Sequence, residues 1–248
     1  MENYTQGKRF ENVTKSLATK IKPRVFVPIS GKNEANFQTI NVILRVGGKA
    51  DVVPFDGQMS KQEYIALVAE KLAGANLIVF PDEFCATDFA KEIFKNELVF
   101  AEIEKLLFVR DGLAFGEGRG VLLLQELGLL PSGVLSPAKT GETDGDEEIS
   151  LAVSSNLSPW LTDCKVGERY LGRFAPQTEL SNAFYGDEKT VEEWSKKGMI
   201  ALVDEGGRID GLTSADGRVF GKLSLQTKNA AVQDIDAKIF QAGLRYYM

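Results

Sequence analysis

Residues 114–133 read AFGEGRGVLLLQELGLLPSG, in which a glycine-rich turn lies between two apolar segments. The short segment before the turn predicts a strand, and the longer one after it predicts a helix. Strand-to-helix turns of this kind carry a nucleophile in some proteins and bind phosphate in others. The turn residues are Gly116, Glu117, Gly118, Arg119 and Gly120. Because none of them is Ser, Cys, Lys or Thr, the sequence predicts a structural turn with no reactive side chain.

The rest of the first half alternates between strand and helix patterns. Apolar runs predict buried strands at 24–29, 50–55, 76–80 and 112–115. Helical spacing is found at 33–46, 61–73, 86–107 and 121–127. Ser60 and Glu63 form the S-x-x-E pattern of a capping box, which marks the start of the second of these helices. This order predicts an α/β fold whose mostly parallel sheet has helices on both faces.

The pattern changes after a loop at 131–148 that is rich in Pro, Gly and acidic residues. Further strands are predicted at 149–154, 169–174, 199–204 and 218–223, a helix from a second capping box at Thr190–Glu193, and an amphipathic helix at 235–247. We therefore expect residues 22–248 to form one domain whose second half extends the sheet with antiparallel strands. Trp160 and Trp194 are expected in its core. Residues 1–21 form a basic segment, which we interpret as solvated rather than as a binding arm.

The composition is that of a globular protein with an acidic charge balance. The chain has 248 residues, of which 44% are hydrophobic and 26% charged, and its net charge is −6. We expect no nucleic-acid partner, because such proteins are usually basic. The sequence shows no signal peptide and no apolar run of membrane-spanning length, so we expect a cytoplasmic protein without membrane contact. Cys85 and Cys164 fit free thiols in a reducing compartment.

The sequence contains no histidine. Histidine is the side chain whose ordinary pKa lies nearest neutrality, and it is the general base in most nucleophile triads. Triads of the Ser-His-Asp and Cys-His-Glu types are therefore excluded. Histidine is also the commonest metal ligand, and the two cysteines have no metal-ligand spacing. We accordingly expect neither a metal nor another cofactor.

Several separated segments, in order, resemble the class I glutamine amidotransferase domain of phosphoribosylformylglycinamidine synthase in its long bacterial form. Besides the turn, they are KPRVFVPISGKNEAN at 22–36, LGLLPSG at 127–133, VSSNLSPWL at 153–161, VGERY at 166–170, GLTSADGRVFGKL at 211–223 and DAKIFQAGLRYY at 236–247. The resemblance runs from about residue 22 to the end of the sequence. It implies a flavodoxin-like fold and, for the family, hydrolysis of glutamine. In that reaction a cysteine attacks the amide, a histidine serves as base, a glutamate orients the histidine, and the ammonia passes to a synthetase.

The family motifs place each of these functions on a residue that cannot perform it. The nucleophile of the family turn G-x-C-x-G falls on Gly118, the base on Leu225 and the orienting acid on Thr227. The glutamine that follows the nucleophile falls on Leu122, and a second histidine-containing stretch falls on 175–178. A glycine pair whose amides stabilise the oxyanion in the family falls on Asp82 and Glu83. The resemblance thus implies a domain that has lost its catalytic triad.

The residues left around the predicted turn are Phe84, Cys85, Glu117, Arg119 and Leu122, and we expect them to line what remains of the glutamine cleft. Glycine at position 118 is consistent with an elbow kept for folding, because it adopts the strained backbone at little steric cost. We expect Glu117 and Arg119 to form a surface ion pair. Cys85 as a substitute nucleophile is the less favoured interpretation, because a thiolate needs a nearby cation or base, here Arg119 or Lys91.

These observations favour a catalytically inactive glutamine amidotransferase-like protein with a binding or scaffolding role. Its partner would be a synthetase-like protein or a second copy of the chain, because the family domain docks on a synthetase body. One alternative is a working accessory or glutaminase-type subunit in purine biosynthesis, which would need Cys85 or another unrecognised group. A second alternative is a small-molecule sensor that uses the old glutamine cleft.

Overall fold

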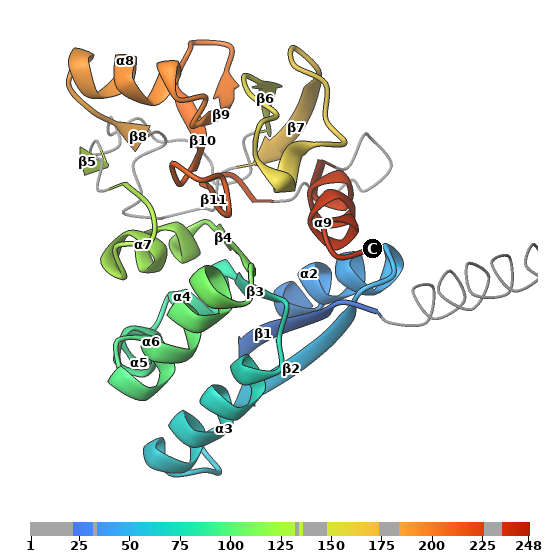
Figure 1. Ribbon diagram of the computed structural model, residues 1–248, viewed down its shortest axis with the longest axis vertical. Helices are drawn as coiled ribbons and strands as arrows, with labels where there is room; N and C mark the ends of the chain where they lie inside the picture. Colours follow the sequence, from blue (N-terminus) through green and yellow to red (C-terminus); the bar gives the residue numbers. More distant parts are fainter. Residues whose placement is uncertain (1–21, 32–33, 132–133, 136–147, 174–183, 226–234) are drawn as a thin grey trace, which may run out of the picture.

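The computed structural model describes residues 22–31, 34–131, 134–135, 148–173, 184–225 and 235–248 (Figure 1). The basic segment at 1–21, the stretch at 175–178 and Thr227 lie outside these ranges. Within the described ranges, every helix is too short or too polar to cross a lipid bilayer.

One mixed sheet runs through the molecule. Its main path has the order β2-β1-β3-β4-β11-β10-β9-β6-β7. These strands are β1 (Arg24–Ser30), β2 (Lys49–Phe55), β3 (Leu77–Phe80), β4 (Leu113–Glu117), β6 (Glu148–Val153), β7 (Arg169–Arg173), β9 (Ile200–Asp204), β10 (Ile209–Thr213) and β11 (Val219–Lys222). The short strands β5 (Val134–Leu135) and β8 (Phe184–Tyr185) pair with each other, and β8 also pairs with β10.

The direction of pairing divides the sheet into two halves. The strands from β2 to β11 pair in parallel, and those from β11 to β7 pair antiparallel. This confirms the predicted α/β fold with a largely parallel first half and an antiparallel extension. The two halves meet where β11 lies beside β4, in a register that pairs Val219 with Ala114 and Lys222 with Glu117.

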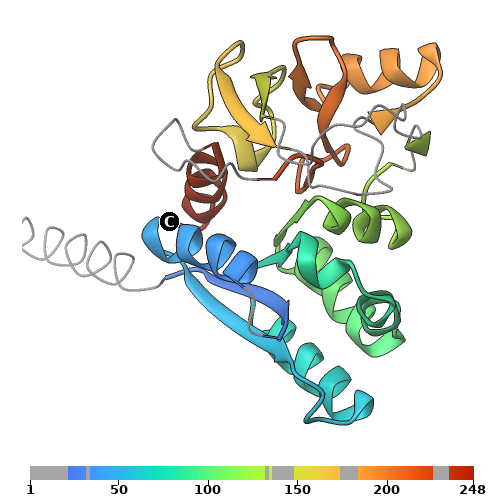
Figure 2. The same cartoon turned by 180° about the vertical axis from the view of Figure 1, so that it is seen from behind.

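Helices cover both faces of the parallel half (Figures 1 and 2). The described helices are α2 (Glu34–Arg45), α3 (Lys61–Ala73), α4 (Asp82–Cys85), α5 (Asp88–Phe94), α6 (Glu97–Glu104), a π-helix at Lys105–Val109, α7 (Arg119–Glu126), α8 (Glu188–Lys196) and α9 (Ile235–Arg245), with a 3₁₀ turn at Pro159–Leu161. Of these, α8 lies beside the antiparallel half (Figure 1). Figure 2 shows α2 and α9 near each other on one face, whereas α3, α5, α6 and α7 pack on the other.

The alternation of side chains along the central strands explains why both faces are apolar. Val25 and Val27 of β1 pack beneath α2 and α9, whereas Phe26 between them packs on the opposite face. Such period-two burial on both sides is what a covered parallel sheet requires. Trp160 and Trp194 are buried, as predicted, on opposite sides of the sheet.

The two predicted capping boxes have different outcomes. Ser60 accepts a hydrogen bond from the Glu63 backbone N–H and Glu63 reaches back to Ser60, so the box at the start of α3 is confirmed. The box at Thr190–Glu193 is wrong, because Asp187 caps α8 by accepting from the Thr190 backbone N–H at 2.7 Å. An Asp at the cap gains both this hydrogen bond and the attraction of its charge to the helix dipole.

Strand β4 is longer than the sequence predicts. The predicted strand ends at Phe115, but pairing with β11 continues to Glu117. The ladder with β11 therefore carries a charged residue into the sheet, and this position becomes important at the site described below.

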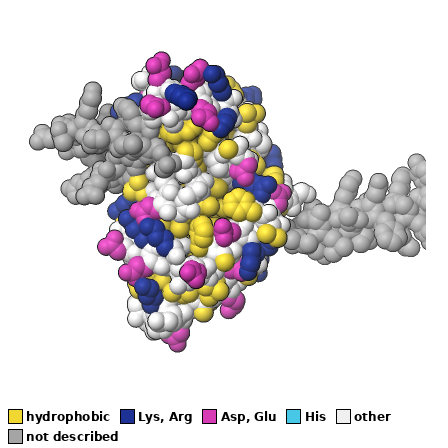
Figure 3. All heavy atoms as spheres, turned by 60° about the vertical axis from the view of Figure 1, so that its left-hand side comes forward, with side chains coloured by type: hydrophobic (Ala, Val, Ile, Leu, Met, Phe, Trp, Pro, Cys, Tyr) yellow, Lys and Arg dark blue, Asp and Glu magenta, His cyan; other side chains and the backbone are white. Residues whose placement is uncertain are grey.

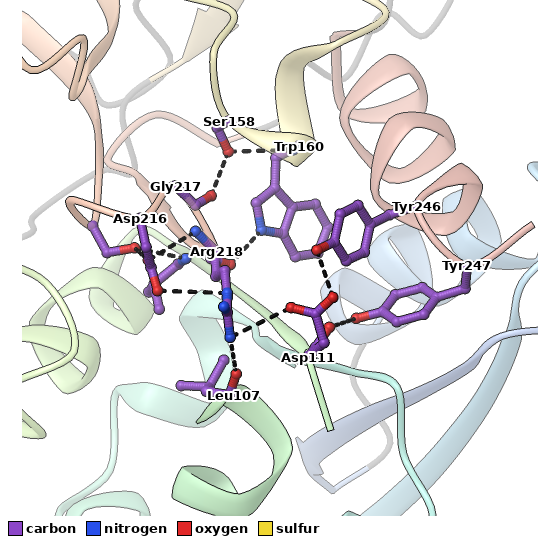
Figure 4. Close-up of polar contacts among 11 residues, drawn as sticks. Leu107, Asp111, Ser158, Trp160, Asp216, Gly217, Arg218, Tyr246 and Tyr247 are labelled. Carbon is purple, nitrogen blue, oxygen red and sulfur yellow. Dashed lines mark hydrogen bonds and ion pairs between the residues drawn. The ribbon is translucent and has the colours of Figure 1, made fainter. Parts of the chain in front are cut away.

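The C-terminal residues Tyr246 and Tyr247 form hydrogen bonds with the turn that precedes β4 (Figure 4). Asp111 in this turn has φ 57°, a left-handed conformation unusual for a residue with a side chain. Its carboxylate accepts from the Tyr246 hydroxyl at 2.8 Å and lies 3.4 Å from an Arg218 guanidinium nitrogen. Arg218 also donates to the carbonyl of Leu107, in the π-helix. The Tyr247 hydroxyl lies 3.0 Å from the carbonyl oxygen of Asp111.

Loss of the Tyr247 hydroxyl is expected to destabilise the fold. This hydroxyl is also 3.0 Å from the carbonyl of Asn76, so it bridges the turns before β3 and β4. Tyr247→Phe should lower the free energy of unfolding by about 1 kcal/mol, measured by urea denaturation. Tyr246→Phe is the matched control, and because Tyr246 is exposed it should cost less than about 0.5 kcal/mol. Equal losses in the two variants would contradict this role for Tyr247.

Candidate functional site

The predicted turn is a sharp elbow between β4 and α7. Its central residue, Gly118, has φ 54° and ψ −121°, which residues with side chains rarely adopt. Gly120 is constrained for another reason, because a Cβ at this position would lie 2.2 Å from the carbonyl oxygen of Phe80. Glycine is therefore required at 118 by backbone conformation and at 120 by the close approach of α7 to β3.

The side chain of Asp82 fills the space above the elbow. A Cβ built on Gly118 would lie 2.2 Å from Oδ1 of Asp82. The same oxygen accepts from the Arg119 backbone N–H at 2.7 Å and from Arg119 Nε at 3.1 Å. The second carboxylate oxygen accepts from Arg119 Nη2 at 2.6 Å. Asp82 thus holds the first residue of α7 through both its backbone and its side chain.

This contact is an internal carboxylate-binding site. The Asp82 side chain is 7% exposed and that of Arg119 is 32% exposed. A carboxylate buried to this degree is stable only when charge-assisted hydrogen bonds replace its water, and a bidentate arginine is the strongest donor for that purpose. The N-terminus of α7 adds a backbone donor and a favourable dipole. The backbone N–H and guanidinium of Arg119 at the elbow therefore bind a carboxylate, and that carboxylate is the side chain of Asp82.

The predicted ion pair between Glu117 and Arg119 is wrong. Arg119 bonds Asp82 instead, and Glu117 is buried on the side of the sheet that α2 and α9 cover. The hydroxyl of Thr39, on α2, donates to Glu117 Oε1 at 2.8 Å. Glu117 is the last residue of β4 and Arg119 is the first residue of α7, and the sharp turn at Gly118 between them directs the two side chains apart.

Glu117 belongs to a buried cluster of ionisable side chains. Lys222, its register partner on β11, is 1% exposed and lies 3.0 Å from the Asp236 carboxylate of α9. Burial raises the pKa of Glu117 to about 7. Lys222 and the hydrogen bond from Thr39 lower this pKa, and Asp236 and Asp82 raise it, but burial is the largest effect. This cluster was not among the features predicted from the sequence.

A signal for the cluster was present in the sequence. Lys222 has the same parity along its strand as the buried Phe220, and Glu117 the same parity as the buried Phe115. Two charges at inward positions of neighbouring strands indicate a buried pair. The pairing of the strands, more than 100 residues apart in sequence, was the missing information.

Cys85 has the properties of a buried structural thiol. It is 6% exposed and packs in the core below the elbow. Burial raises its pKa well above the ordinary value and Asp82 raises it further, whereas Arg119 has a smaller opposing effect. Lys91, the other cation considered for it, forms an ion pair with Glu126 at 2.9 Å. The thiolate form needed for nucleophilic attack is therefore strongly disfavoured near neutral pH.

The remaining predicted residues are placed as follows. Phe84 is fully buried and makes an edge contact with Phe94, so its ring belongs to the core. Glu83 and Leu122 are half-buried. Leu225 is also half-buried, and its backbone exchanges two hydrogen bonds with Arg173 at 2.8 and 3.1 Å. Among the predicted positions within the described residues, Asp82 and Arg119 are joined by side-chain hydrogen bonds and an ion pair.

A shallow hollow lies on the described surface away from the elbow. It has a volume of about 250 Å³ and is lined by Lys95, Phe100, Glu126 and Leu127. Among the described residues, no three His, Cys, Asp or Glu side chains are grouped as a metal ion would require. On the face shown in Figure 3, positive and negative side chains are interspersed rather than gathered by sign.

The sheet order and the elbow at the end of a central parallel strand define a glutamine amidotransferase-like fold. PurLQS from Thermotoga maritima has a similar solved structure, with a TM-score of 0.66, 21% sequence identity, and 92% of this chain and 100% of that chain covered. A putative GMP synthase subunit from Thermoplasma acidophilum gives a TM-score of 0.57 at 10% identity, with 92% and 94% covered. No family model matches the sequence. No curated protein matches it either.

Removal of the Asp82 carboxylate is expected to loosen the elbow. Asp82→Ala should lower the free energy of unfolding by about 2 kcal/mol, because it leaves the Arg119 N–H and guanidinium without their acceptor. Sodium formate should restore part of this loss by supplying a carboxylate, whereas sodium chloride at equal ionic strength should not. Thermal unfolding with each salt measures the effect.

Glu83→Ala is the matched control for this experiment, because Glu83 is adjacent and half-buried. It should change stability by less than about 0.5 kcal/mol and show no specific response to formate. An equal loss in both variants, or an equal response to both salts, would contradict the assignment of a carboxylate site at the elbow.

The thiols of the native protein are expected to react slowly. Both cysteines are buried, and burial raises the pKa of Cys164 to about 11. Native protein at pH 8 should therefore be modified by iodoacetamide at least tenfold more slowly than the same protein in urea, followed by mass spectrometry. Cys164→Ser isolates the response of Cys85. Rapid native modification of Cys85 in that variant would revive it as a candidate nucleophile.

Proposed function

We propose that this protein is a glutamine amidotransferase-like domain that does not hydrolyse glutamine and acts by binding another protein. The observation that carries the proposal is the Asp82 carboxylate, which accepts from the Arg119 backbone N–H at 2.7 Å and occupies the space beside Gly118. The residue at position 118 corresponds to the family nucleophile in the resemblance described above.

Electrostatics at the elbow oppose acyl-transfer chemistry. Attack on an amide develops negative charge on its oxygen, and catalysis requires donors directed at that oxygen. Here the N–H of the residue after the nucleophile position already bonds a carboxylate. A second negative charge beside Asp82 would be repelled in a buried setting where screening is weak. The site is therefore arranged against the intermediate that the family reaction requires.

Proton transfer lacks a suitable group as well. The full sequence has no histidine, and Leu225 stands at the position that corresponds to the family base. Cys85 is buried with a raised pKa, and its attack would need a base. These features together support the loss of glutaminase activity.

A binding role is supported by what the chain retains. The structural match to the Thermotoga maritima protein extends over 92% of this chain and the whole of that chain, so the chain retains the fold over nearly its full length. In the family that the sequence resembles, the domain docks on a synthetase, so we propose a synthetase-like protein or a second copy of this chain as partner. We further propose a cytoplasmic protein without nucleic-acid or membrane partners.

A glutaminase assay tests the loss of activity. The wild-type protein should release ammonia from glutamine at the rate of a heat-denatured sample, because the elbow has no nucleophile and the chain has no histidine to serve as base. An active class I glutamine amidotransferase, assayed in parallel, is the positive control. Turnover clearly above the denatured sample would overturn the proposal, and its loss in Cys85→Ala would then identify the nucleophile.

A double variant tests whether the missing base alone is enough to abolish glutamine hydrolysis, once the elbow is freed and given a thiol. Asp82→Gly with Gly118→Cys frees the elbow and supplies a thiol, but the chain still has no histidine to serve as base. It should remain at background. Activity in this variant would mean that Asp82 and the missing thiol alone account for the loss.

Light scattering and affinity capture test the binding role. Light scattering measures self-association, and affinity capture measures binding to a synthetase-like protein. A monomer that binds no synthetase-like protein would contradict the proposed role.

A further inference from the structure

The buried cluster beside the elbow joins both halves of the fold. Glu117 lies on β4, Lys222 on β11 and Asp236 in the first turn of α9. Their exposed fractions are 9%, 1% and 3%. The side chains thus share an interior space at the end of the parallel ladder, where charges interact strongly because water is excluded.

The cluster has one ammonium group and more than one carboxylate that can pair with it. Asp236 lies 3.0 Å from Lys222 Nζ, and Glu117 faces the same lysine across the ladder. Burial alone lowers the pKa of Lys222, but Asp236, Glu117 and Asp210 together raise it above its ordinary value. The lysine therefore stays charged while the charge on Glu117 varies.

The groups that act on the charge of Glu117 come from four elements. They are Lys222 of β11, Asp236 of α9, Thr39 of α2 and Asp82 of α4, of which Asp82 acts from the elbow, where it bonds Arg119. Asp210 of β10 also raises the pKa of Lys222, and its carboxylate accepts from the Ser224 backbone N–H at 3.0 Å and the Ser224 hydroxyl at 2.9 Å. When Glu117 is neutral, Lys222 and Asp236 form a balanced pair beside it. When Glu117 is ionised, two carboxylates face one ammonium and repel each other.

We propose that Glu117 is a proton-dependent latch for the first turn of α9. The protonated side chain leaves Lys222 paired with Asp236 and holds α9 against β11. The ionised side chain competes with Asp236 for the same ammonium and loosens that turn. The latch is independent of glutamine hydrolysis and so goes beyond the proposed function.

The direction of the pH dependence follows from linkage. The pKa of Glu117 is raised from 4.5 to about 7 in the folded protein. Opening of the first turn of α9 releases Glu117 toward its ordinary pKa, so opening becomes easier as the pH rises above 4.5 and levels off above about 7. Each pKa unit is a factor of ten, which sets an upper limit of about 300-fold on the change.

Amide hydrogen exchange of the whole chain tests the latch. Protection factors, which are corrected for the intrinsic effect of pH on exchange, are measured at intervals from pH 5 to pH 9 for residues 235–245 and for α3 as reference. In the wild type, protection at the start of α9 should fall at least tenfold relative to α3. In Glu117→Gln, which keeps the shape and the acceptor for Thr39, it should stay constant.

Two further variants keep the test decisive. Thr39→Val removes a hydrogen bond that favours ionised Glu117, so the fall should level off at a higher pH. Asp210→Asn removes the other titrating carboxylate and should keep the wild-type fall. The proposal is overturned by constant wild-type protection, by an equal fall in Glu117→Gln, by an unchanged profile in Thr39→Val, or by loss of the fall in Asp210→Asn.

Discussion

The parallel pairing of β4 with β11 is the constraint on which the rest of the structure depends. These strands are separated in the chain by residues 118–218, yet they lie in register from Val219 beside Ala114 to Lys222 beside Glu117. The ladder extends β4 by two residues, so that the chain must turn sharply at Gly118 to begin α7. It also unites the parallel and antiparallel halves around one sheet, with α9 returning to pack beside α2.

Two buried acidic side chains near the end of β4 have opposite environments. Asp82 receives three hydrogen bonds from Arg119, including one from the backbone. Glu117 receives one from Thr39 and shares a single lysine with Asp236. The first carboxylate has donors fixed in place on both of its oxygens. The second is stabilised better when neutral, because burial outweighs the partial compensation from Lys222.

The elbow retains the backbone shape of a catalytic turn while its polar groups are satisfied internally. A strained backbone persists where the surrounding structure fixes it, and glycine reduces the cost of that conformation. The N-terminus of α7 would attract an external anion if it were open, but the carboxylate of Asp82 already lies on it. Helix α4, which carries Asp82, also places Cys85 in the core rather than at the surface.

The sequence by itself determined the fold class, the positions of most helices and strands, the turn at Gly118 and the absence of histidine chemistry. These are set by local apolar periodicity, by glycine and by composition, which need no knowledge of distant contacts. Only the tertiary structure decided that Arg119 bonds Asp82 rather than Glu117, that Asp187 rather than Thr190 caps α8, and that Lys222 is buried between carboxylates. The partners in the Arg119 and Lys222 contacts are brought together by strand order and helix packing, and spacing along the chain does not encode which charges meet inside a folded sheet.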